Sequence, residues 1–432
     1  MPAFLIMPRV REMSIPASSA LLAAGLLLIA MGSGACSTAS DSTSEVEPET
    51  TIPAASETVR IAVFNVEELS TEKITQTDAG GVGINPQARA AAQIIQRVRP
   101  DILVLSEIDH DYDAADQGLD LNARRFATAY LATGANPIDY PYTFAAPNNT
   151  GILSGFDLDS NGVIAGDAER GDRAHGDDSF GFGLYPGQYS MAVLSRFPIL
   201  AEQARTFQKF LWKDLPDNHI PEGYFSPEVL EVFRLSSKSH WDVPVQIGRD
   251  TLHLFVSHPT PPVFDGQEDK NGRRNFDEIK FWVAYLGNGE ALYDDDGGRG
   301  GFGSEAPFVI LGDLNAYPDS PEGVYDDMPA IAQLLGHPRI QDTGSLATSR
   351  GALQRRGEYQ GGKPGPPRFL ERATARWAGG VRVDYVLPST NLIVRGGGVF
   401  WLSQEEDAEG LALAEQASDH HLVWIDVSFA GR

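Results

Sequence analysis

The sequence is poor in cysteine, in basic residues and in long apolar runs, and each shortage excludes something. Cys36 is the single cysteine among 432 residues, so no disulfide can form within the chain. The 34 Lys and Arg face 59 Asp and Glu, which gives a formal net charge of −25. A chain with this charge repels polyanions at long range, so stable nucleic-acid binding over a broad basic surface is not expected.

The apolar run near the N-terminus has the pattern of an export signal. Two arginines precede it, and it covers residues 20–31, which is too short for a mature membrane-spanning helix. Cys36 follows a few small residues, where a bacterial lipoprotein is cleaved and acylated. We predict a lipoprotein-type signal peptide over residues 1–36, lipidation of Cys36 and a place in the cell envelope. Ordinary cleavage near Ala35, with secretion of a free protein, is the alternative.

The rest of the chain divides into a tether and one large domain. Residues 37–58 are rich in Ser, Thr, Glu and Pro and hold too little apolar surface to fold, so we predict a disordered tether. From residue 59 to residue 432, short apolar runs alternate with long polar inserts. We place these inserts at about 140–188, 205–245 and 262–306.

Apolar periodicity predicts several strands and few helices. A strand over 59–66, a helix over 86–98 and a second strand ending near Glu107 form one strand-helix-strand unit. Further strand-like runs follow in the order QYSMAVLSRFPI, TLHLFVSH, FVILGDLN, RVDYVLPS and HLVWIDVSF. This composition predicts an α+β fold of stacked mixed sheets flanked by helices.

Polar side chains stand at the ends of these runs. Each alone is compatible with a cap, a turn or a solvated group, but their shared placement favours a common site. Carboxylates that meet at one rim raise one another's pKa unless a cation lies between them, and an oxygen-rich set suits Mg²⁺ or Mn²⁺. The residues are Asn65, Glu107, His258, Asp313 with Asn315, Asp384, and Asp419 with His420.

The order of these motifs resembles the endonuclease/exonuclease/phosphatase superfamily, which includes pancreatic-type deoxyribonuclease, apurinic endonucleases, sphingomyelinases and inositol polyphosphate 5-phosphatases. The resemblance covers about residues 59–429, and its most specific parts are GDLN and the final SDH. It implies a four-layer α/β/β/α sandwich of two packed mixed sheets, in a secreted bacterial member. The remaining motifs that carry it are FNVEEL, PDILVLSEID, YSMAVLSRFPI, FVSHPTPP and RVDYVLPS.

On the metal side, the resemblance implies a set of acids and one amide. Glu107 matches the family's metal-binding glutamate, and Asp419 is similar to a second acid near the metal. Asn65 and Glu67 match the amide and acid of the first strand, with Glu67 at a position where Asp is frequent.

On the catalytic side, the resemblance implies five further roles. Asp313 matches the aspartate that orients or deprotonates the attacking water, and Asn315 matches the amide that helps hold the phosphate. His420 resembles the histidine that contacts the scissile phosphate, with Asp384 as its orienting partner. His258 matches a histidine that assists the leaving group.

The spacing of Asp313 and Asn315 suggests a geometry of its own. Residues two apart on an extended strand project to the same face, so both side chains would face the substrate while Leu314 points into the core. Gly312 would leave room for close approach of the substrate or of a neighbouring backbone.

Two other patterns lie in the inserts. Asp157, Asp159 and Asn161 have the spacing of the front of a calcium loop, with Asp167 or a later acid needed to complete a Ca²⁺ site; an acidic turn without an ion is the alternative. Basic groups that suit phosphate binding interrupt the acidic background, although they fit surface charges equally well. These groups are Lys238, His240, Arg273 and Arg274.

Together these features predict an exported hydrolase that uses Mg²⁺ or Mn²⁺ to attack a phosphoester with an activated water. An extracellular nuclease is the nearest alternative, with nucleic acid as substrate only. An inactive, calcium-stabilised surface binding protein is the alternative from another class. No protein partner can be inferred, and contact with a membrane would depend on a lipid anchor at Cys36.

Overall fold

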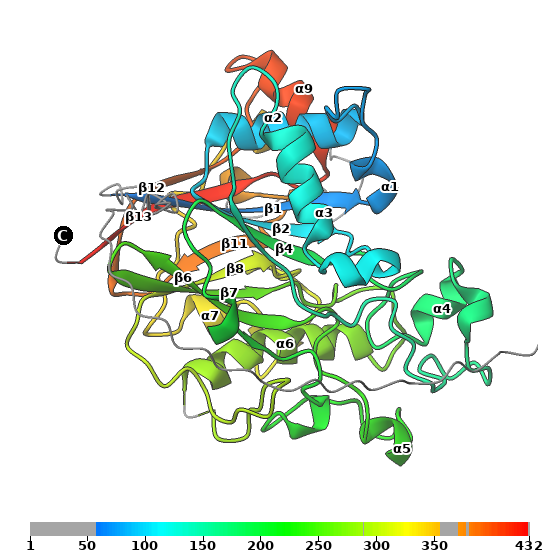
Figure 1. Cartoon of the computed structure of the whole chain (residues 1–432). Coiled ribbons are helices and arrows are strands. Elements are labelled where there is room, and N and C mark those ends of the chain that lie inside the picture. Colours follow the sequence, from blue (N-terminus) through cyan, green and yellow to red (C-terminus); the bar gives the residue numbers. More distant parts are fainter. Residues whose placement is uncertain (1–57, 288, 355–369, 377–379, 431–432) are drawn as a thin grey trace, which may run out of the picture. The chain divides into compact units, whose positions relative to one another are not determined.

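The computed structural model describes residues 58–287, 289–354, 370–376 and 380–430, which belong to one unit of the chain, Ile52–Arg432 (Figure 1). The predicted signal peptide, Cys36 and all of the predicted tether except Thr58 lie outside the described residues. Within the described part, no helix has both the length and the apolarity needed to cross a membrane.

The first of two large sheets has six strands. β1 and β2 run parallel at its centre, with Val63 opposite Val104, and the other neighbours are antiparallel, so the sheet is mixed. The strand order is β12 (Leu392–Val399), β13 (Val423–Phe429), β1 (Val59–Leu69), β2 (Ile102–Ile108), β4 (Met191–Ser195) and β3 (Tyr142–Phe144).

The second large sheet has five strands and is also mixed. β7 and β8 are parallel, and the remaining pairs are antiparallel. The strand order is β11 (Asp384–Pro388), β8 (Phe308–Asp313), β7 (Asp250–Ser257), β6 (His240–Ile247) and β5 (Arg205–Thr206).

Successive side chains of a strand point to opposite faces of its sheet, and the apolar side chains therefore form three large clusters. Val63 of the first sheet and Val256 of the second belong to one cluster between the sheets. Phe64, next to Val63 on β1, belongs to a second cluster with residues of α2 (Pro86–Val98), α3 (Leu121–Phe126) and α9 (Ala408–Ala417). Phe255 packs with α6 (Lys270–Leu286) on the outer face of the second sheet. The fold is therefore α+β, with helices outside two packed sheets (Figure 1).

The helix predicted over 86–98 has these bounds in the structure, and its ends explain why. The side chain of Asn85 accepts a hydrogen bond from the Ala88 N–H, and Pro86 occupies the first turn, where no N–H is needed. Arg99 adopts the left-handed conformation at the C-terminus, and Pro100 follows.

The predicted inserts contain more regular structure than the sequence suggested. α6 lies inside 262–306, β6 begins inside 205–245, and β3 lies inside 140–188. The shorter elements are α1 (Thr71–Ile74), α4 (Arg173–Asp177), α5 (Pro227–Leu230), α7 (Ala332–Leu335), α8 (Gly351–Gln354), β9 (Val324–Tyr325), β10 (Met328–Pro329), and the 3₁₀ or π turns η1 (Tyr112–Gln117), η2 (Ala127–Leu131), η3 (Asp167–Glu169), η4 (Ala201–Gln203), η5 (Trp212–Asp214) and η7 (Leu370–Arg372).

Candidate active site

Strand ends from both sheets bring the predicted polar residues together. Asn65 lies on β1 and Glu107 near the end of β2, while Asp313 ends β8 opposite Asp384, the first residue of β11. The Asn65 side-chain nitrogen donates to Glu107 Oε1 and to Asp313 Oδ2, both at 3.0 Å. One amide therefore links the two sheets at the site.

His420 joins this cluster from the segment before β13. Its Nδ1 lies 2.9 Å from Asp384 Oδ2, and its Nε2 lies 3.8 Å from Asp313 Oδ2. The Ser418 hydroxyl accepts from the His420 N–H and donates to the Asn65 carbonyl oxygen. These contacts hold the imidazole so that Nδ1 faces Asp384 and Nε2 faces the carboxylate of Asp313.

His258 follows β7 and approaches the same Asp313 oxygen as His420 does. It is buried, and its Nε2 lies 3.5 Å from Asp313 Oδ2. Glu107, His258 and Asp313 each offer a ligand atom within 4.8 Å of the others, as do Asp313, Asp384 and His420. Asp313 is thus the carboxylate that the two groups share.

Burial and nearby charges set the protonation of Asp313 and His420. Burial raises the pKa of Asp313 to about 7; the positive charge of His420 opposes this shift, and the negative charge of Asp384 adds to it. Burial alone would lower the pKa of His420, but the charges of Asp384 and Asp313 hold it well above its usual 6.5. At neutral pH His420 is therefore positively charged, while Asp313 can take or release a proton.

The pKa of His258 is shifted in the opposite direction from that of His420. Burial lowers its pKa well below 6.5, and the positive charges of Lys238 and His420 lower it further. His258 is therefore a neutral imidazole at neutral pH, and the two histidines beside Asp313 differ in charge.

A more open group of carboxylates lies on the Glu107 side. The Asp419 N–H donates to Glu67 Oε2 at 2.8 Å, and the side chains of Glu67 and Asp419 are 47% and 34% exposed. Burial raises the pKa of Glu67, and the charges of Asp419 and Glu107 raise it further. A divalent cation would relieve this repulsion, and carboxylate oxygens are donors that Mg²⁺ and Mn²⁺ prefer. The chemistry of these acids suits such a metal, and Glu107 also belongs, with His258 and Asp313, to a group whose ligand atoms lie within 4.8 Å of one another.

Two left-handed segments direct these acids, and neither contains glycine. Glu67 and Glu68 have φ angles of 47° and 51°, where the pairing of β1 with β2 shifts register between Asn65 and Leu69. Glu107 has a φ of 63°. Left-handed backbone is costly for Glu, so these positions store strain where the carboxylates converge.

Asn315 reaches the site through a turn, so the prediction of strand alternation is wrong for this residue. β8 ends at Asp313, and Asn315 has a φ of 50°, in the left-handed region that Asn tolerates. The Asn315 N–H donates to Asp313 Oδ1 at 2.9 Å, and its side-chain nitrogen donates to the Pro259 carbonyl oxygen at 3.0 Å. Leu314 is fully buried, as the sequence predicted.

Gly312 has the role that the sequence suggested for it, which is close approach of a neighbouring backbone. A Cβ atom at this position would lie 1.9 Å from the Ser257 carbonyl oxygen. Since Ser257 ends β7 and precedes His258, this contact sets the distance between the strand ends that carry His258 and Asp313.

Lys238 is the one predicted basic group that lies among these acids. It is 6% exposed, and no hydrogen bond or ion pair to its Nζ occurs within the described residues. Burial lowers its pKa, against the attraction of Glu278, Glu107 and Asp313. An ammonium group is therefore held next to the carboxylate cluster without a protein partner of its own.

The other three basic groups, for which phosphate binding and surface charge were both open, make hydrogen bonds to backbone acceptors. His240 is buried, with Nε2 2.8 Å from a backbone carbonyl oxygen of α6. Arg274 is buried and donates to the Leu235 carbonyl oxygen at 2.8 Å. Arg273 donates to the Glu268 carbonyl oxygen at 2.9 Å. Each of the three thus gives at least one donor to the protein backbone.

The predicted calcium loop closes in a different way from the one expected. Asp157 and Asp159 converge with Asp178, not with Asp167, which begins η3. The Asn161 N–H donates to Asp157 Oδ1 at 3.0 Å and to Asp159 Oδ1 at 3.1 Å. Asp178 accepts two backbone N–H bonds of the same loop. Backbone N–H groups of the loop thus hold these carboxylates, and the ligand atoms of Asp157, Asp159 and Asp178 lie within 4.8 Å of one another, so Ca²⁺ binding here stays a prediction.

Sequence reasoning missed two groups that shape the site. The Tyr189 hydroxyl donates to Glu68 Oε1 at 2.6 Å, beside the metal-side acids. Glu278 accepts from the N–H groups of Ser237 and Thr260, both at 2.6 Å. It therefore holds together the segment that contains Lys238 and the segment that contains His258. Tyr189 lies within the strand-like run QYSMAVLSRFPI, near the start of its apolar part, which is a usable signal; Glu278 lies on a helix that the sequence did not predict.

Comparisons with known proteins identify a family and similar solved structures. A family model described as the Endonuclease/Exonuclease/phosphatase family matches residues 62–420. No curated protein matches the chain. Similar solved structures include an endonuclease/exonuclease/phosphatase from Beutenbergia cavernae, with 16% identity, a TM-score of 0.47 and coverage of 87% of this chain and 72% of that one. The human Nocturnin catalytic domain with bound sulfate anion shares 15% identity, with a TM-score of 0.42 and coverage of 87% and 95%.

Proposed function

The chain belongs to the endonuclease/exonuclease/phosphatase family, and from this premise we propose that it is a divalent-metal-dependent phosphoester hydrolase that attacks phosphorus with an activated water. The observation that carries the proposal is the surroundings of Asp313. This buried carboxylate is held by Asn65 at 3.0 Å and flanked by the Nε2 atoms of His258 at 3.5 Å and His420 at 3.8 Å.

Water activation is assigned to Asp313. A general base works best when its pKa lies near the working pH, and burial raises that of Asp313 to about 7. The Asn315 N–H donates to Oδ1 and the Asn65 amide to Oδ2, so the carboxylate is fixed in one orientation. A water held against it would be ready for in-line attack on phosphorus.

Stabilisation of the phosphoryl oxygens is assigned to His420 and Lys238. Asp384 keeps His420 protonated and leaves its Nε2 on the substrate side. Lys238 offers an ammonium group without a protein partner among the described residues. Donors that are already in place where negative charge develops are worth more in a buried site than in water. Neutral His258 supplies a further hydrogen bond, which we assign to the leaving oxygen.

Glu107, Glu67 and Asp419 would hold the divalent cation, as the repulsion among them suggests. Such an ion, when bound, neutralises charge on phosphoryl oxygens and lowers the cost of alkoxide departure. The protein residues named above carry the proton transfer and the orientation of the phosphate.

A substrate panel tests the proposal and separates its variants. Purified protein is treated with EDTA and assayed on bis(4-nitrophenyl) phosphate, 4-nitrophenyl phosphate and DNA, with Mg²⁺, Mn²⁺ or Ca²⁺ added back. We expect hydrolysis of the diester that depends on Mg²⁺ or Mn²⁺. Preference for DNA would identify the enzyme as a nuclease, although the formal net charge of −25 disfavours binding of nucleic acid. No hydrolysis of any substrate with any of the three metals would overturn the proposal.

We also propose that the enzyme is exported and held at the cell envelope through a lipid on Cys36, because this cysteine follows an export-type apolar run. Fractionation of cells that express the full chain tests this. The wild type should be found with membranes, and Cys36→Ser should release the protein; equal membrane association of both would contradict the anchor.

A further inference from the structure

The carboxylate of Glu107 is held by two hydrogen-bond donors, and one of them has no role in the chemistry above. The Asn65 amide donates to Glu107 Oε1 at 3.0 Å, and the backbone N–H of Glu68 donates to Oε2 at 3.1 Å. A carboxylate oxygen has two lone pairs, so each oxygen can bind a cation while it accepts such a bond. The two donors therefore set the orientation of the Glu107 carboxylate.

The side chain of Glu68 is held in turn by Tyr189. The Tyr189 hydroxyl donates to Glu68 Oε1 at 2.6 Å. Tyr189 lies two residues before β4, and Glu68 lies at the end of β1, with β2 between these two strands in the sheet. The hydrogen bond therefore spans the end of β2, where Glu107 lies.

Glu68 adopts a backbone conformation that is costly for its residue type. Its φ is 51°, in the left-handed region, and that of Glu67 is 47°. The Gln87 side chain donates to the carbonyl oxygens of Val66 and Glu67, at 2.8 and 2.7 Å, and Lys73 donates to that of Glu68 at 2.7 Å. Such strain persists where the surroundings impose it, and it is frequent at functional sites. Glycine would adopt this backbone without strain, so a role of the Glu68 side chain accounts for its presence.

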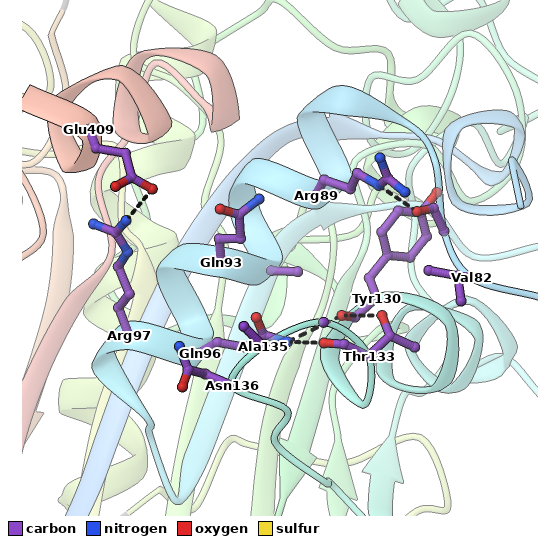
Figure 2. Close-up of a pocket in the computed structure, with 13 residues that line it drawn as sticks. Val82, Arg89, Gln93, Gln96, Arg97, Tyr130, Thr133, Ala135, Asn136 and Glu409 are labelled. Carbon is purple, nitrogen blue, oxygen red and sulfur yellow. Dashed lines mark hydrogen bonds and ion pairs between the residues drawn. The ribbon is translucent and has the colours of Figure 1, made fainter.

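A cavity of about 390 Å³ between α2 and η2 is lined by polar side chains that the protein itself engages (Figure 2). Arg97 pairs with Glu409 at 2.7 Å, and Arg89 donates to a backbone carbonyl oxygen at 2.6 Å. Gln96 donates to two backbone carbonyl oxygens, at 2.8 and 2.7 Å. These contacts account for the placement of the polar side chains without a ligand, so we assign no site to this cavity.

Taking the proposed function as its basis, we propose that Tyr189 and Glu68 are positioning residues for the divalent cation. Tyr189 holds the Glu68 side chain, and Glu68 presents its backbone N–H to Glu107. The Glu107 carboxylate is thereby preorganised to bind the ion. Loss of an outer hydrogen-bond partner of a metal ligand typically lowers the affinity for the metal by about 10- to 100-fold. The two residues therefore determine how tightly the ion is held.

Binding of Mn²⁺ to substrate-free protein tests the inference. Calorimetry on EDTA-treated and dialysed protein should give a Kd about 10-fold higher for Tyr189→Phe than for the wild type. This variant keeps every carboxylate, so a change in charge cannot explain the result. Tyr142→Phe removes the same hydroxyl from β3, where Tyr142 lies in register with Ser195, which pairs with Ile102 at the start of β2. Because Glu107 lies at the other end of β2, this control should have the wild-type Kd.

Substitutions of Glu68 separate its backbone from its side chain. Glu68→Gly keeps the N–H group and suits the left-handed backbone, but it removes the acceptor of the Tyr189 hydroxyl. In EDTA it should be at least as stable to urea as the wild type, whereas its Kd for Mn²⁺ should be about 10-fold higher. Glu68→Gln, whose amide oxygen can accept from Tyr189, should restore part of the affinity. Glu72→Gln, which removes a charge from an exposed position four residues away, should have the wild-type Kd.

The inference and the proposed function can fail separately. Equal Kd values for Tyr189→Phe and the wild type would overturn the inference, and so would wild-type affinity of Glu68→Gly for Mn²⁺. Neither result would affect the proposed function, because hydrolysis requires only that the ion binds. A wild type that binds Mn²⁺ but hydrolyses none of the panel substrates would instead count against the proposed function.

Discussion

At the scale of the residue, the site holds several buried ionisable side chains close together, and burial makes the charged form of each unfavourable. Asp313, His258 and Lys238 are all buried, and burial shifts the pKa of each toward its neutral form. Such perturbed groups are typical of catalytic sites, where the fold bears a cost in stability for reactivity. Replacing such a group by a neutral side chain should therefore raise the free energy of unfolding and lower the activity.

Lys238 allows a direct test of this expectation. Its buried ammonium group has no protein partner among the described residues, so Lys238→Met should raise the free energy of unfolding by about 1 kcal/mol. The same change should lower kcat/KM for a phosphodiester about 100-fold, because a donor to the phosphate is lost. Denaturant unfolding and steady-state kinetics measure the two effects. Lys209→Met, at an exposed position, should change neither; a Lys238→Met variant that is both less stable and fully active would contradict the assignment.

His219 predicts how stability depends on pH away from the site. Its Nδ1 lies 2.7 Å from Asp277, and this hydrogen bond raises the pKa of His219 above 6.5. Because the folded state holds the proton more tightly, the stabilisation is complete below pH 6.5 and is lost as the pH rises through the raised pKa. Tm values measured between pH 6 and pH 9 should fall less steeply for His219→Gln than for the wild type. His337→Gln, where burial lowers the pKa, should keep the wild-type slope above about pH 7.5, where His337 is neutral in both the folded and the unfolded state; parallel curves for His219→Gln and the wild type would rule out this role.

At the scale of the element, the site depends on where strands end. β1 and β2 deliver Asn65 and Glu107 from one sheet, and β8 and β11 deliver Asp313 and Asp384 from the other. The polar strand ends were readable from the sequence because each interrupts an apolar run. The backbone that aims them was not, since Glu67, Glu107 and Asn315 adopt left-handed conformations without a glycine to signal them.

Gly312 tests the spacing between β7 and β8. A Cβ atom 1.9 Å from the Ser257 carbonyl oxygen would force the strands apart, so Gly312→Ala should lower the free energy of unfolding by at least about 2 kcal/mol. Activity should fall as well, because His258 and Asp313 lie at the ends of these strands. Gly396→Ala in β12, whose nearest atom would be 3.7 Å away, serves as the control. Equal stability of both variants in urea titrations would show that the close contact is not a constraint.

The elements that the sequence missed share a physical cause. The sequence predicts a polar insert where α6 lies, because this helix buries Arg274, Asp277 and Glu278 together with apolar residues, which masks the helical period. β12 contains three consecutive glycines, which are depleted in strands and interrupt its apolar pattern. In both cases tertiary contacts decide the structure, and local propensity does not reveal them.

At the scale of the whole molecule, the sequence alone permitted the two-sheet fold, and the family resemblance specified it. Residues as distant as Asn65 and Asp313 come into contact only when the sheets pack face to face, and no local pattern encodes that packing. The elements within the inserts, such as α6 and β3, had no counterpart in the motifs.

Metal binding should be visible as a property of the whole fold. The acids near Glu107 repel one another, so an ion that binds only the folded state adds stability, by about 2.7 kcal/mol at 100 times its Kd. Thermal unfolding of EDTA-treated protein should therefore show a Tm that rises with added Mg²⁺ or Mn²⁺ and saturates. Glu107→Gln should abolish most of this rise, and Glu305→Gln, at an exposed position, should retain it. A Tm that does not respond to either metal in the wild type would contradict the assigned site.

The most direct test of the central claim is kcat of Asp313→Asn with a phosphodiester and saturating Mg²⁺ or Mn²⁺. The substitution keeps the size of the side chain and removes the group that takes the proton from water, so kcat should fall about 1,000-fold with little change in KM. Asp319→Asn, at an exposed position nearby in the sequence, should retain wild-type kcat. An Asp313→Asn variant with kcat close to that of the wild type would contradict the account.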